Sequence, residues 1–478
     1  MSTSFASMLP TYQEGLGSGG LYFGWDQVSP QAVQDLKRAI GAGYANPAFG
    51  QGSVHQVQNL DPTLRASTFT HKSIRAWPLI PKTEAISTIV EYNIIKEWGG
   101  LGGLFTNPGE LPALSDALYI RTGKFVRYLA IQKEVKHPLT VIKPAHEDLK
   151  VRETKNGTMM MLEAAERAIF DGNSLVVPQE WDGFAAQCFA DPDFISQNVI
   201  DLEGRHPTED DVENAATRIT ERNGTPDLMF LQPKNISELG KDYFSRQRAM
   251  MPPTASATVG FQVVRQLTSA GTIDFLSNIH IRAGRRGGIK TPPEAALYPT
   301  APPPPASVSA VAGAGTSRFT ADKAGNYWYG ITAVNRFGES GITWAPAVTA
   351  VATGNMVTVT PVSGGAGTTG FIVYRSRRGV TTVAQAQATA QLIRRFSINE
   401  IFVDENYLLP GHAFLYMLQS DAMNWWFAML LPLMGIPLGR VAISERWAMV
   451  LYGCPIWAIP QFNVIFINAP DSTTGPLY

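Results

Sequence analysis

The chain has 478 residues, of which 45% are hydrophobic and 17% charged, so it is long enough for two to four domains and for a sizeable buried core. Its 39 basic and 40 acidic residues leave a net charge of -1, which gives no electrostatic reason to expect binding to nucleic acid or to a membrane surface. The two cysteines, Cys188 and Cys454, stand far apart, which predicts neither a disulfide framework nor a thiolate zinc site and favours a reducing compartment.

Residues 1–60 predict an arm rather than a domain. Glycine-rich stretches at 15–20 and 41–52 flank one short amphipathic helix at 31–40. Such a segment cannot bury much apolar surface by itself. The first fifteen residues have neither a basic stretch nor a long apolar core, so no secretory signal is expected.

Two extended runs follow, joined by a long tip that is rich in glycine. The first is the β-prone run at 86–92, and the second, at 117–135, mixes charged residues with apolar and aromatic ones. An isolated two-stranded ribbon is at best marginally stable in water, so we expect it to pack on its own domain or on a neighbouring subunit. The candidate inter-subunit contacts are three apolar tip residues and three basic residues of the returning run: Trp98, Leu104, Phe105, Arg121, Lys124 and Arg127.

A long amphipathic helix is predicted within residues 151–173. Its apolar residues recur at steps of three and four, which places them on one face. They are Met161, Leu162, Ala165, Ala168 and Ile169. Glu163, Glu166 and Arg167 are expected largely on the opposite side. Gly172 is expected to close the helix in the left-handed conformation.

Beyond this helix the pattern predicts mixed α and β packing, as in a compact α+β domain. Residues 206–224 form a second helix, with Thr208 and Asp211 spaced as in a capping box. Residues 227–232 read as a buried strand, and Asn235 is expected to cap the helix that follows. Extended stretches lie on both sides of a turn at Gly271.

A proline-rich stretch at 292–305 marks a boundary, after which Val, Thr, Gly and Ala dominate. Short strands are predicted at 327–334, 357–362 and 370–375, the pattern of a small β-sandwich. The stretches YGITAVNRFGES and GFIVYRS resemble those of fibronectin type III or immunoglobulin-like modules.

Three further groups of residues are expected to have structural roles. The apolar run 425–438 is too short to span a bilayer and contains two prolines, so it is expected to be buried. The short basic groups at 285–286 and at Arg375, Arg377 and Arg378 are expected on a solvated surface or an interface.

No chemistry-bearing motif stands out in the sequence. It contains no HExxH, GxxxxGK[ST], GxSxG or CxxC. The seven histidines lack ligand spacing, and the acidic run 209–211 lies where a helix dipole favours it. The sequence therefore predicts a protein that is not an enzyme, with no catalytic, cofactor-binding or metal-binding residues.

The order of these parts resembles the major capsid proteins of tailed phages, with the Hong Kong 97-type fold. The resemblance rests on the VEYN run at 90–93, the excursion, the long helix ending in FDGN at 170–173, and GTPDLMFLQPKNISEL at 224–239. It implies an α+β fold with an N-terminal arm, an extended loop, a spine helix, peripheral and axial domains, and an inserted all-β sandwich domain.

The resemblance also implies a division of the chain into segments. The arm would be residues 1–60. The peripheral domain would be 61–190, with the extended loop at 86–135 and the spine helix at 153–171. The axial domain would begin at 191–291, be interrupted by the immunoglobulin-like insert at 292–404, and return in 405–478.

The function implied is self-assembly into an icosahedral head shell that encloses double-stranded DNA without reading its sequence. The expected partners are copies of the chain in hexamers and pentamers, together with portal, scaffold and decoration proteins; no membrane is involved. The expected location is the virion capsid, assembled in the host bacterial cytoplasm. Lys96 and Lys124 lie in the excursion, yet nothing identifies a partner asparagine, so covalent crosslinking is not predicted.

Two alternatives stay open. A cellular nanocompartment shell is a near variant of the same hypothesis. The insert alone is also compatible with a secreted or surface glycan-binding protein, or a glycan-active enzyme with an accessory β-module, which a secretion signal and a pair of carboxylates in a cleft would favour.

Overall fold

The computed structural model of the protein describes residues 71–99, 105–109, 111, 114–141, 148–246, 264–281, 291–296, 298–439 and 443–470. The chain divides into two units, residues 1–66 with 143–147 and residues 67–142 with 148–478. The first unit, which contains the expected arm, lies outside the described residues, as do Leu104 and the pair Arg285 and Arg286. The second unit is of mixed α and β structure, so the predicted α+β class is confirmed.

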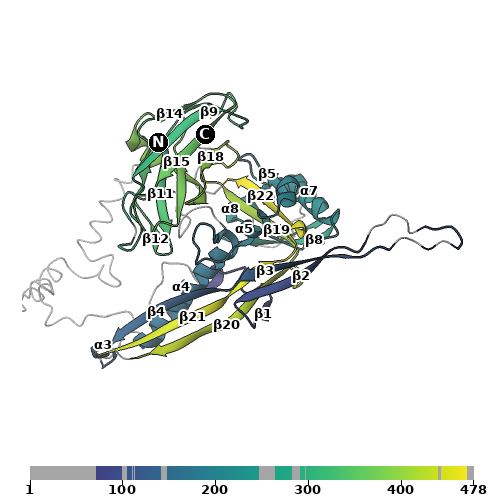
Figure 1. Cartoon of the computed structure of the whole chain (residues 1–478), viewed down its shortest axis with the longest axis horizontal. Helices are drawn as coiled ribbons and strands as arrows, with labels where there is room; N and C mark the ends of the chain where they lie inside the picture. The colour runs from purple at the N-terminus through teal and green to yellow at the C-terminus, as the bar shows by residue number, and fades with distance from the viewer. Residues whose placement is uncertain are drawn as a thin grey trace, which may run out of the picture. The chain divides into compact units, whose positions relative to one another are not determined.

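One layer of the second unit is a four-stranded sheet in the order β1-β20-β21-β4 (Figure 1). Its strands are β1 (Lys82–Glu84), β20 (Trp425–Leu438), β21 (Ser444–Trp457) and β4 (Arg127–Lys136). Strand β1 runs parallel to β20, while β21 pairs antiparallel with both β20 and β4. The short helix α3 (His137–Val141) follows β4.

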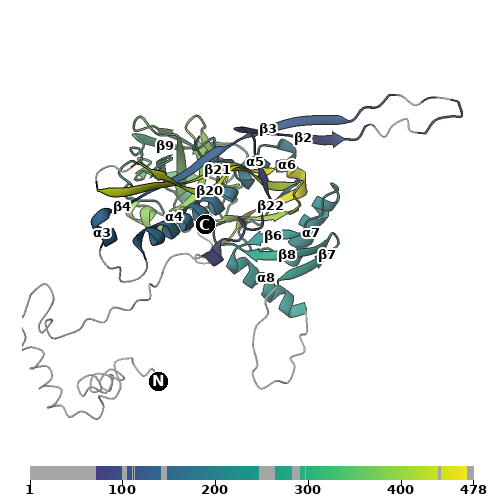
Figure 2. The same ribbon diagram turned by 90° about the horizontal axis from the view of Figure 1, so that it is seen from below.

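The long helix α4 (Leu149–Asp171) packs on this sheet (Figure 2). Gly157 lets the two approach closely, because a Cβ atom at that position would lie 2.7 Å from the sulfur of Met449 on β21. An ion pair of 2.9 Å between Lys133 and Glu153 also joins β4 to the helix. The sheet and helix therefore form one packed layer pair.

Helix α4 confirms most of the predicted amphipathic pattern, since Met161, Ala165 and Ile169 are buried. The expectation for Glu166 was wrong, because this side chain is fully buried. Its carboxylate accepts hydrogen bonds from backbone groups of the segment that precedes β1, which offsets the cost of removing the charge from water.

The end of α4 also differs from the prediction. Gly172 has φ -61° and ψ 139°, an extended conformation rather than a left-handed one. Glycine is required there for space, since a Cβ atom would lie 2.5 Å from the carbonyl oxygen of Trp181. Two short helices follow, α5 (Phe184–Cys188) and α6 (Pro192–Gln197).

The second sheet has six strands in the order β5-β22-β19-β6-β8-β7. They are β5 (Val199–Asp201), β22 (Asn463–Ala469), β19 (Ala413–Leu418), β6 (Leu228–Leu231), β8 (Gly271–Ser277) and β7 (Arg265–Thr268). All four residues of β6 are buried, which confirms the strand predicted at 227–232. Gly271, the first residue of β8, has φ +127° where the chain turns from β7, so this tight turn favours glycine.

Two helices accompany this sheet, α7 (Glu209–Thr220) and α8 (Pro233–Arg246). The capping box of Thr208 and Asp211 is present at the start of α7, as predicted. Asn235 does not cap α8, because that helix begins two residues earlier. The buried amide of Asn235 instead meets Nδ1 of His206 at 2.7 Å.

Residues between the proline-rich stretch and β19 fold into an all-β unit with two main sheets, β18-β15-β9 and β12-β11-β16-β17 with β13 on β11. The bounds are β9 (Ser307–Ala314), β10 (Gly325–Tyr327), β11 (Tyr329–Asn335), β12 (Gly338–Glu339), β13 (Thr343–Trp344), β14 (Thr349–Val351), β15 (Asn355–Val362), β16 (Gly370–Arg375), α9 (Val383–Thr389), β17 (Gln391–Ser397) and β18 (Phe402–Asp404). Strands β10 and β14 form a separate pair. Val357 and Val359 of one sheet share a core with Ile331, Phe371 and Phe396 of the other.

The expected surface position is confirmed for Arg377 and Arg378, which are exposed, but it is wrong for Arg375. Its side chain is buried, at 1% exposure, and its guanidinium lies 2.6 Å from the carboxylate of Asp404 and 2.8 Å from the amide oxygen of Asn406. Burial opposes the charge, but the Asp404 carboxylate raises the pKa of Arg375 above its usual value. Arg375 is therefore part of the core of the all-β unit.

Strand β20 is buried over only part of its length. Trp425, Phe427 and Ala428 are buried, whereas Met434 and Leu438 are exposed. From Pro432 onward the strand is exposed apart from the half-buried Leu433 and Ile436. The expectation that the whole apolar run is buried was therefore wrong.

Candidate functional site

The predicted excursion is an antiparallel ribbon of β2 (Ile89–Glu97) and β3 (Leu118–Phe125). Figure 2 shows it running out past the sheet on which its base lies. Because a strand rises about 3.3 Å per residue, the seven steps from Val90 to Glu97 span about 23 Å. Strand β4 begins two residues after β3 and pairs with β21, so the ribbon covers only part of the extended loop expected at 86–135.

The inner face of the ribbon base is anchored. Val90 and Tyr92 pack against a small core that includes Ala428, Cys454 and Ile456. The ring of Tyr92 meets the ring of Trp426 edge-on at 5.5 Å. Burial, with a smaller effect of the Cys454 thiol, raises the pKa of Tyr92 to about 12. The base therefore has a fixed orientation on the sheet.

The outer face of the ribbon is exposed and carries apolar side chains at its two ends. Cross-strand pairs bring Ile89 beside Phe125 and Ile95 beside Tyr119, and all four side chains are exposed. Between them, Arg121 forms an ion pair of 3.5 Å with Glu91. Exposed apolar side chains of this kind are common at protein contacts, so the expected inter-subunit contact stays a prediction.

The tip adds larger apolar side chains. Trp98 is 84% exposed and Phe105 is completely exposed. Leu111 and Leu114 are equally open to solvent. The role of Trp98 and Phe105 in an inter-subunit contact stays a prediction. Leu104, the third predicted tip residue, lies outside the described residues.

The structure does not bring the three predicted basic residues together. Arg121 lies on the outer face of the ribbon, while Lys124 pairs with Val90 and belongs to the inner face. Arg127 lies in β4 and its guanidinium is 5.8 Å from the ring of Phe125. Ile95 and Tyr119, which extend the exposed surface, were not singled out, although strict alternation along each strand would have paired them.

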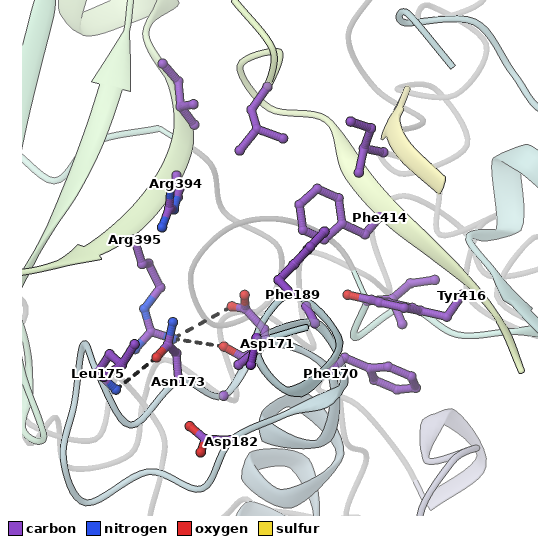
Figure 3. Close-up of a pocket in the computed structure, with 18 of the residues that line it drawn as sticks. Phe170, Asp171, Asn173, Leu175, Asp182, Phe189, Arg394, Arg395, Phe414 and Tyr416 are labelled. Carbon is purple, nitrogen blue, oxygen red and sulfur yellow. Dashed lines mark hydrogen bonds and ion pairs between the residues drawn. The ribbon is translucent and has the colours of Figure 1, made fainter. Parts of the chain in front are cut away.

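A cavity of about 620 Å³ lies where the end of α4 meets α5, β19 and β17 of the all-β unit (Figure 3). Its aromatic side consists of Phe170, Phe189, Phe414 and Tyr416, with the rings of Phe170 and Tyr416 stacked at 5.1 Å. The polar residues that line it include Lys124, Asn173, Asp182, Arg394 and Arg395. Leu175 also lines the cavity and is 74% exposed, so the cavity opens to the surface at this residue.

Arg395 attaches the all-β unit to the rest of the fold at this cavity. Its guanidinium lies 2.9 Å from Glu180 and 3.8 Å from Asp171. Both carboxylates lie outside the unit, earlier in the sequence. Burial opposes its charge, but these two carboxylates raise the pKa of Arg395 above its usual value. Val176 adds an apolar contact, since it packs with Ile372 and Tyr374 of β16. An ionic contact and an apolar contact beside the cavity therefore hold the all-β unit to the segment that follows α4.

The described residues show neither a cluster of metal ligands nor a helix suited to a membrane. Within the described ranges, no three His, Cys, Asp or Glu side chains gather closely enough to hold a metal ion. Among the same residues, none of the helices combines the length and the hydropathy that crossing a bilayer requires. Cys188 and Cys454 are both buried free thiols.

Comparison with known proteins gives similarity in structure only. No family model and no curated protein matches the sequence. The chain is similar to the capsid of an empty GTA particle, with a TM-score of 0.45 and 8% identity over 89% of this chain and 100% of that one. It is similar to a structure from Microbacterium phage Oxtober96, with a TM-score of 0.45 and 8% identity over 88% and 98% of the two chains. It is also similar to the SrpI encapsulin complex of Synechococcus elongatus PCC 7942, with a TM-score of 0.38 and 9% identity over 87% and 95%.

Proposed function

We propose that this chain is the subunit of a closed protein shell, namely a major capsid protein that encloses the double-stranded DNA genome of a tailed bacteriophage. One observation carries the proposal: a ribbon about 23 Å long bears apolar side chains at both ends of its outer face and at its tip, and the described part of its own chain leaves them exposed. A second copy would bury what one copy cannot.

The energy available from such burial is large on the scale of assembly. At about 25 cal/mol per Å², an aromatic side chain that buries about 200 Å² contributes on the order of 5 kcal/mol. Trp98 and Phe105 are both available for this purpose. Repetition of the contact around a closed shell would multiply a modest pairwise affinity.

The order of parts supports the same proposal. An extended ribbon, a long helix packed across a sheet and a separate six-stranded sheet follow the order that the capsid resemblance implies. The net charge of -1 favours a role in enclosing DNA by geometry rather than by binding many phosphates. The partners in this proposal are hexamers and pentamers of the chain, with portal, scaffold and decoration proteins, in a virion assembled in the bacterial cytoplasm.

The first test is the assembly state of the full-length protein, measured by sedimentation and negative-stain microscopy, with and without a co-expressed scaffold candidate. We expect capsomers or shells. The double variant Ile95→Lys and Tyr119→Lys is expected to stay monomeric, because it places charges on the outer ribbon face. Val311→Lys, at an exposed position of β9 in the all-β unit, is the matched control and should still assemble.

The outcomes separate the competing functions. Wild-type protein that remains monomeric under every condition would overturn the shell proposal, and binding to a glycan panel would then be measured. Shells that contain cargo protein but protect no DNA from nuclease would favour a cellular compartment over a phage capsid. Shells that protect DNA of defined length would support the full proposal.

A further inference from the structure

We propose that the cavity between α4, α5, β17 and β19 is the receptor for Trp98 of a second copy of this chain. The inference rests on the proposed function, since it names the surface that receives the ribbon. It joins the exposed aromatic side chain on the ribbon to an aromatic-lined cavity with an open mouth.

The size and lining of the cavity suit an aromatic side chain. A volume of about 620 Å³ is typical of sites that enclose a compact ligand. Phe189 and Phe414 meet edge-on at 6.0 Å, and their rings line the same side as Phe170 and Tyr416 (Figure 3). Aromatic rings prefer such offset and edge-on neighbours, so an indole entering there would find suitable partners.

The polar side of the cavity suits tryptophan in particular. The carboxylate of Asp182 accepts a hydrogen bond of 2.9 Å from the backbone N–H of Ser174 and retains further lone pairs. It can accept the indole N–H, which phenylalanine and leucine lack. Glu97, the neighbour of Trp98 in sequence, carries a charge opposite to that of Lys124 and Arg394 in the lining of the cavity.

The ribbon cannot deliver Trp98 to the cavity of its own chain. Lys124 lines the cavity and pairs with Val90 at the base of the ribbon. From that base the paired strands run outward for about 23 Å before Trp98 is reached. The side chain and its receptor therefore lie on different surfaces of one chain, and their contact must join two copies.

This geometry sets the mode of assembly. When a projection on one surface enters a cavity on another, the interface is heterologous, and copies join head to tail into a ring or an open chain. The cavity also includes Arg394 and Arg395 of β17, so the all-β unit would form part of the contact between copies.

The test is a disulfide trap in the full-length chain, carrying Lys96→Cys and Leu175→Cys together, which leaves Trp98 in place and puts a thiol on the exposed Lys96 position beside it. Leu175 lies exposed at the mouth of the cavity, and the two native thiols are buried. Oxidation should give a ladder of dimers, trimers and larger species on a non-reducing gel, because each chain carries both halves of the contact. The pair Lys96→Cys and Val311→Cys is the control, and it should give no ladder above the dimer.

A second measurement uses Ala190→Trp, which fills the cavity from an exposed position of its lining. We expect loss of capsomers with an unchanged far-ultraviolet circular dichroism spectrum, which shows that the monomer still folds, whereas Val311→Trp should assemble normally. Wild-type shells together with an absent ladder and an assembling Ala190→Trp variant would overturn this inference and leave the shell proposal standing. Absence of any wild-type assembly would instead contradict the proposed function itself.

Discussion

The carboxylate of Glu166 on α4 accepts a hydrogen bond of 2.7 Å from the backbone N–H of Ala76, a residue ninety positions earlier in the chain. It also accepts the backbone N–H groups of Arg75 and Trp77 and the side-chain amide of Asn278. One buried charge thus fixes the segment that leads into the ribbon, the long helix and the end of β8.

Replacing Glu166 by glutamine is expected to destabilise the fold by about 2–4 kcal/mol, because the amide has one acceptor oxygen where the carboxylate has two and leaves buried N–H donors unpaired. The measurement is urea unfolding followed by circular dichroism. Glu163→Gln, at a half-buried position of the same helix, is the control and should change the unfolding free energy by less than about 0.5 kcal/mol. Equal effects of the two changes would contradict the role of Glu166.

The buried pair of Arg375 and Asp404 gives a second prediction. Removing one partner leaves an uncompensated charge in the core, so Arg375→Met and Asp404→Asn are each expected to cost about 3–5 kcal/mol. The double variant should be more stable than the sum of the two changes predicts, as a double-mutant cycle by urea unfolding would show. Strict additivity would mean that the pair does not act as a unit.

The cysteines give a prediction for pH. Burial raises the pKa of Cys454 to about 12, and it also raises the pKa of Cys188. Neither thiol should react with iodoacetamide at pH 8 in the folded protein, as mass spectrometry can check. The folded state binds these protons more tightly than the unfolded state, so the free energy of unfolding is unaffected below about pH 8.5 and falls as the pH rises toward 12. Cys454→Ala should show a smaller fall, and rapid alkylation of the native protein would contradict the prediction.

The tight end of α4 gives a further prediction. A Cβ atom at Gly172 would lie 2.5 Å from the carbonyl oxygen of Trp181 and 2.6 Å from that of Ala168, so Gly172→Ala is expected to cost about 1–3 kcal/mol. At Gly435 nothing lies within 4 Å of the same position, and Gly435→Ala should leave the thermal unfolding midpoint nearly unchanged. A stable Gly172→Ala variant would show that the loop after the helix can move aside.

The buried face of α4 and the start of α7 could be predicted from the sequence, because each depends on residues that are close together in the chain. The spacing of Met161, Ala165 and Ile169 identified the buried face of α4. The capping box of Thr208 and Asp211 located the start of α7, because both hydrogen bonds lie within one turn.

The features that depend on distant partners could not be predicted in this way. The extended run 117–135 divides into β3 and β4 because the two halves pair with β2 and β21, which lie on opposite sides of it in sequence. Asn235 has the composition of a cap, yet its partner is His206. The cavity was missed for the same reason, since Phe170, Phe414 and Arg395 come together only in the folded chain.

Val126 separates the ribbon strand β3 from the sheet strand β4 by a single residue, which is buried and whose N–H bonds to the carbonyl oxygen of Thr88 at 2.8 Å. The ribbon is therefore joined to the sheet through this residue. With an arm of about 23 Å, a rotation of about 5° at Val126 displaces the far end by about 2 Å. Because β4 lies in the sheet that supports α4, any load on the far end of the ribbon is carried directly into that sheet, and changes in its curvature would in turn redirect the ribbon.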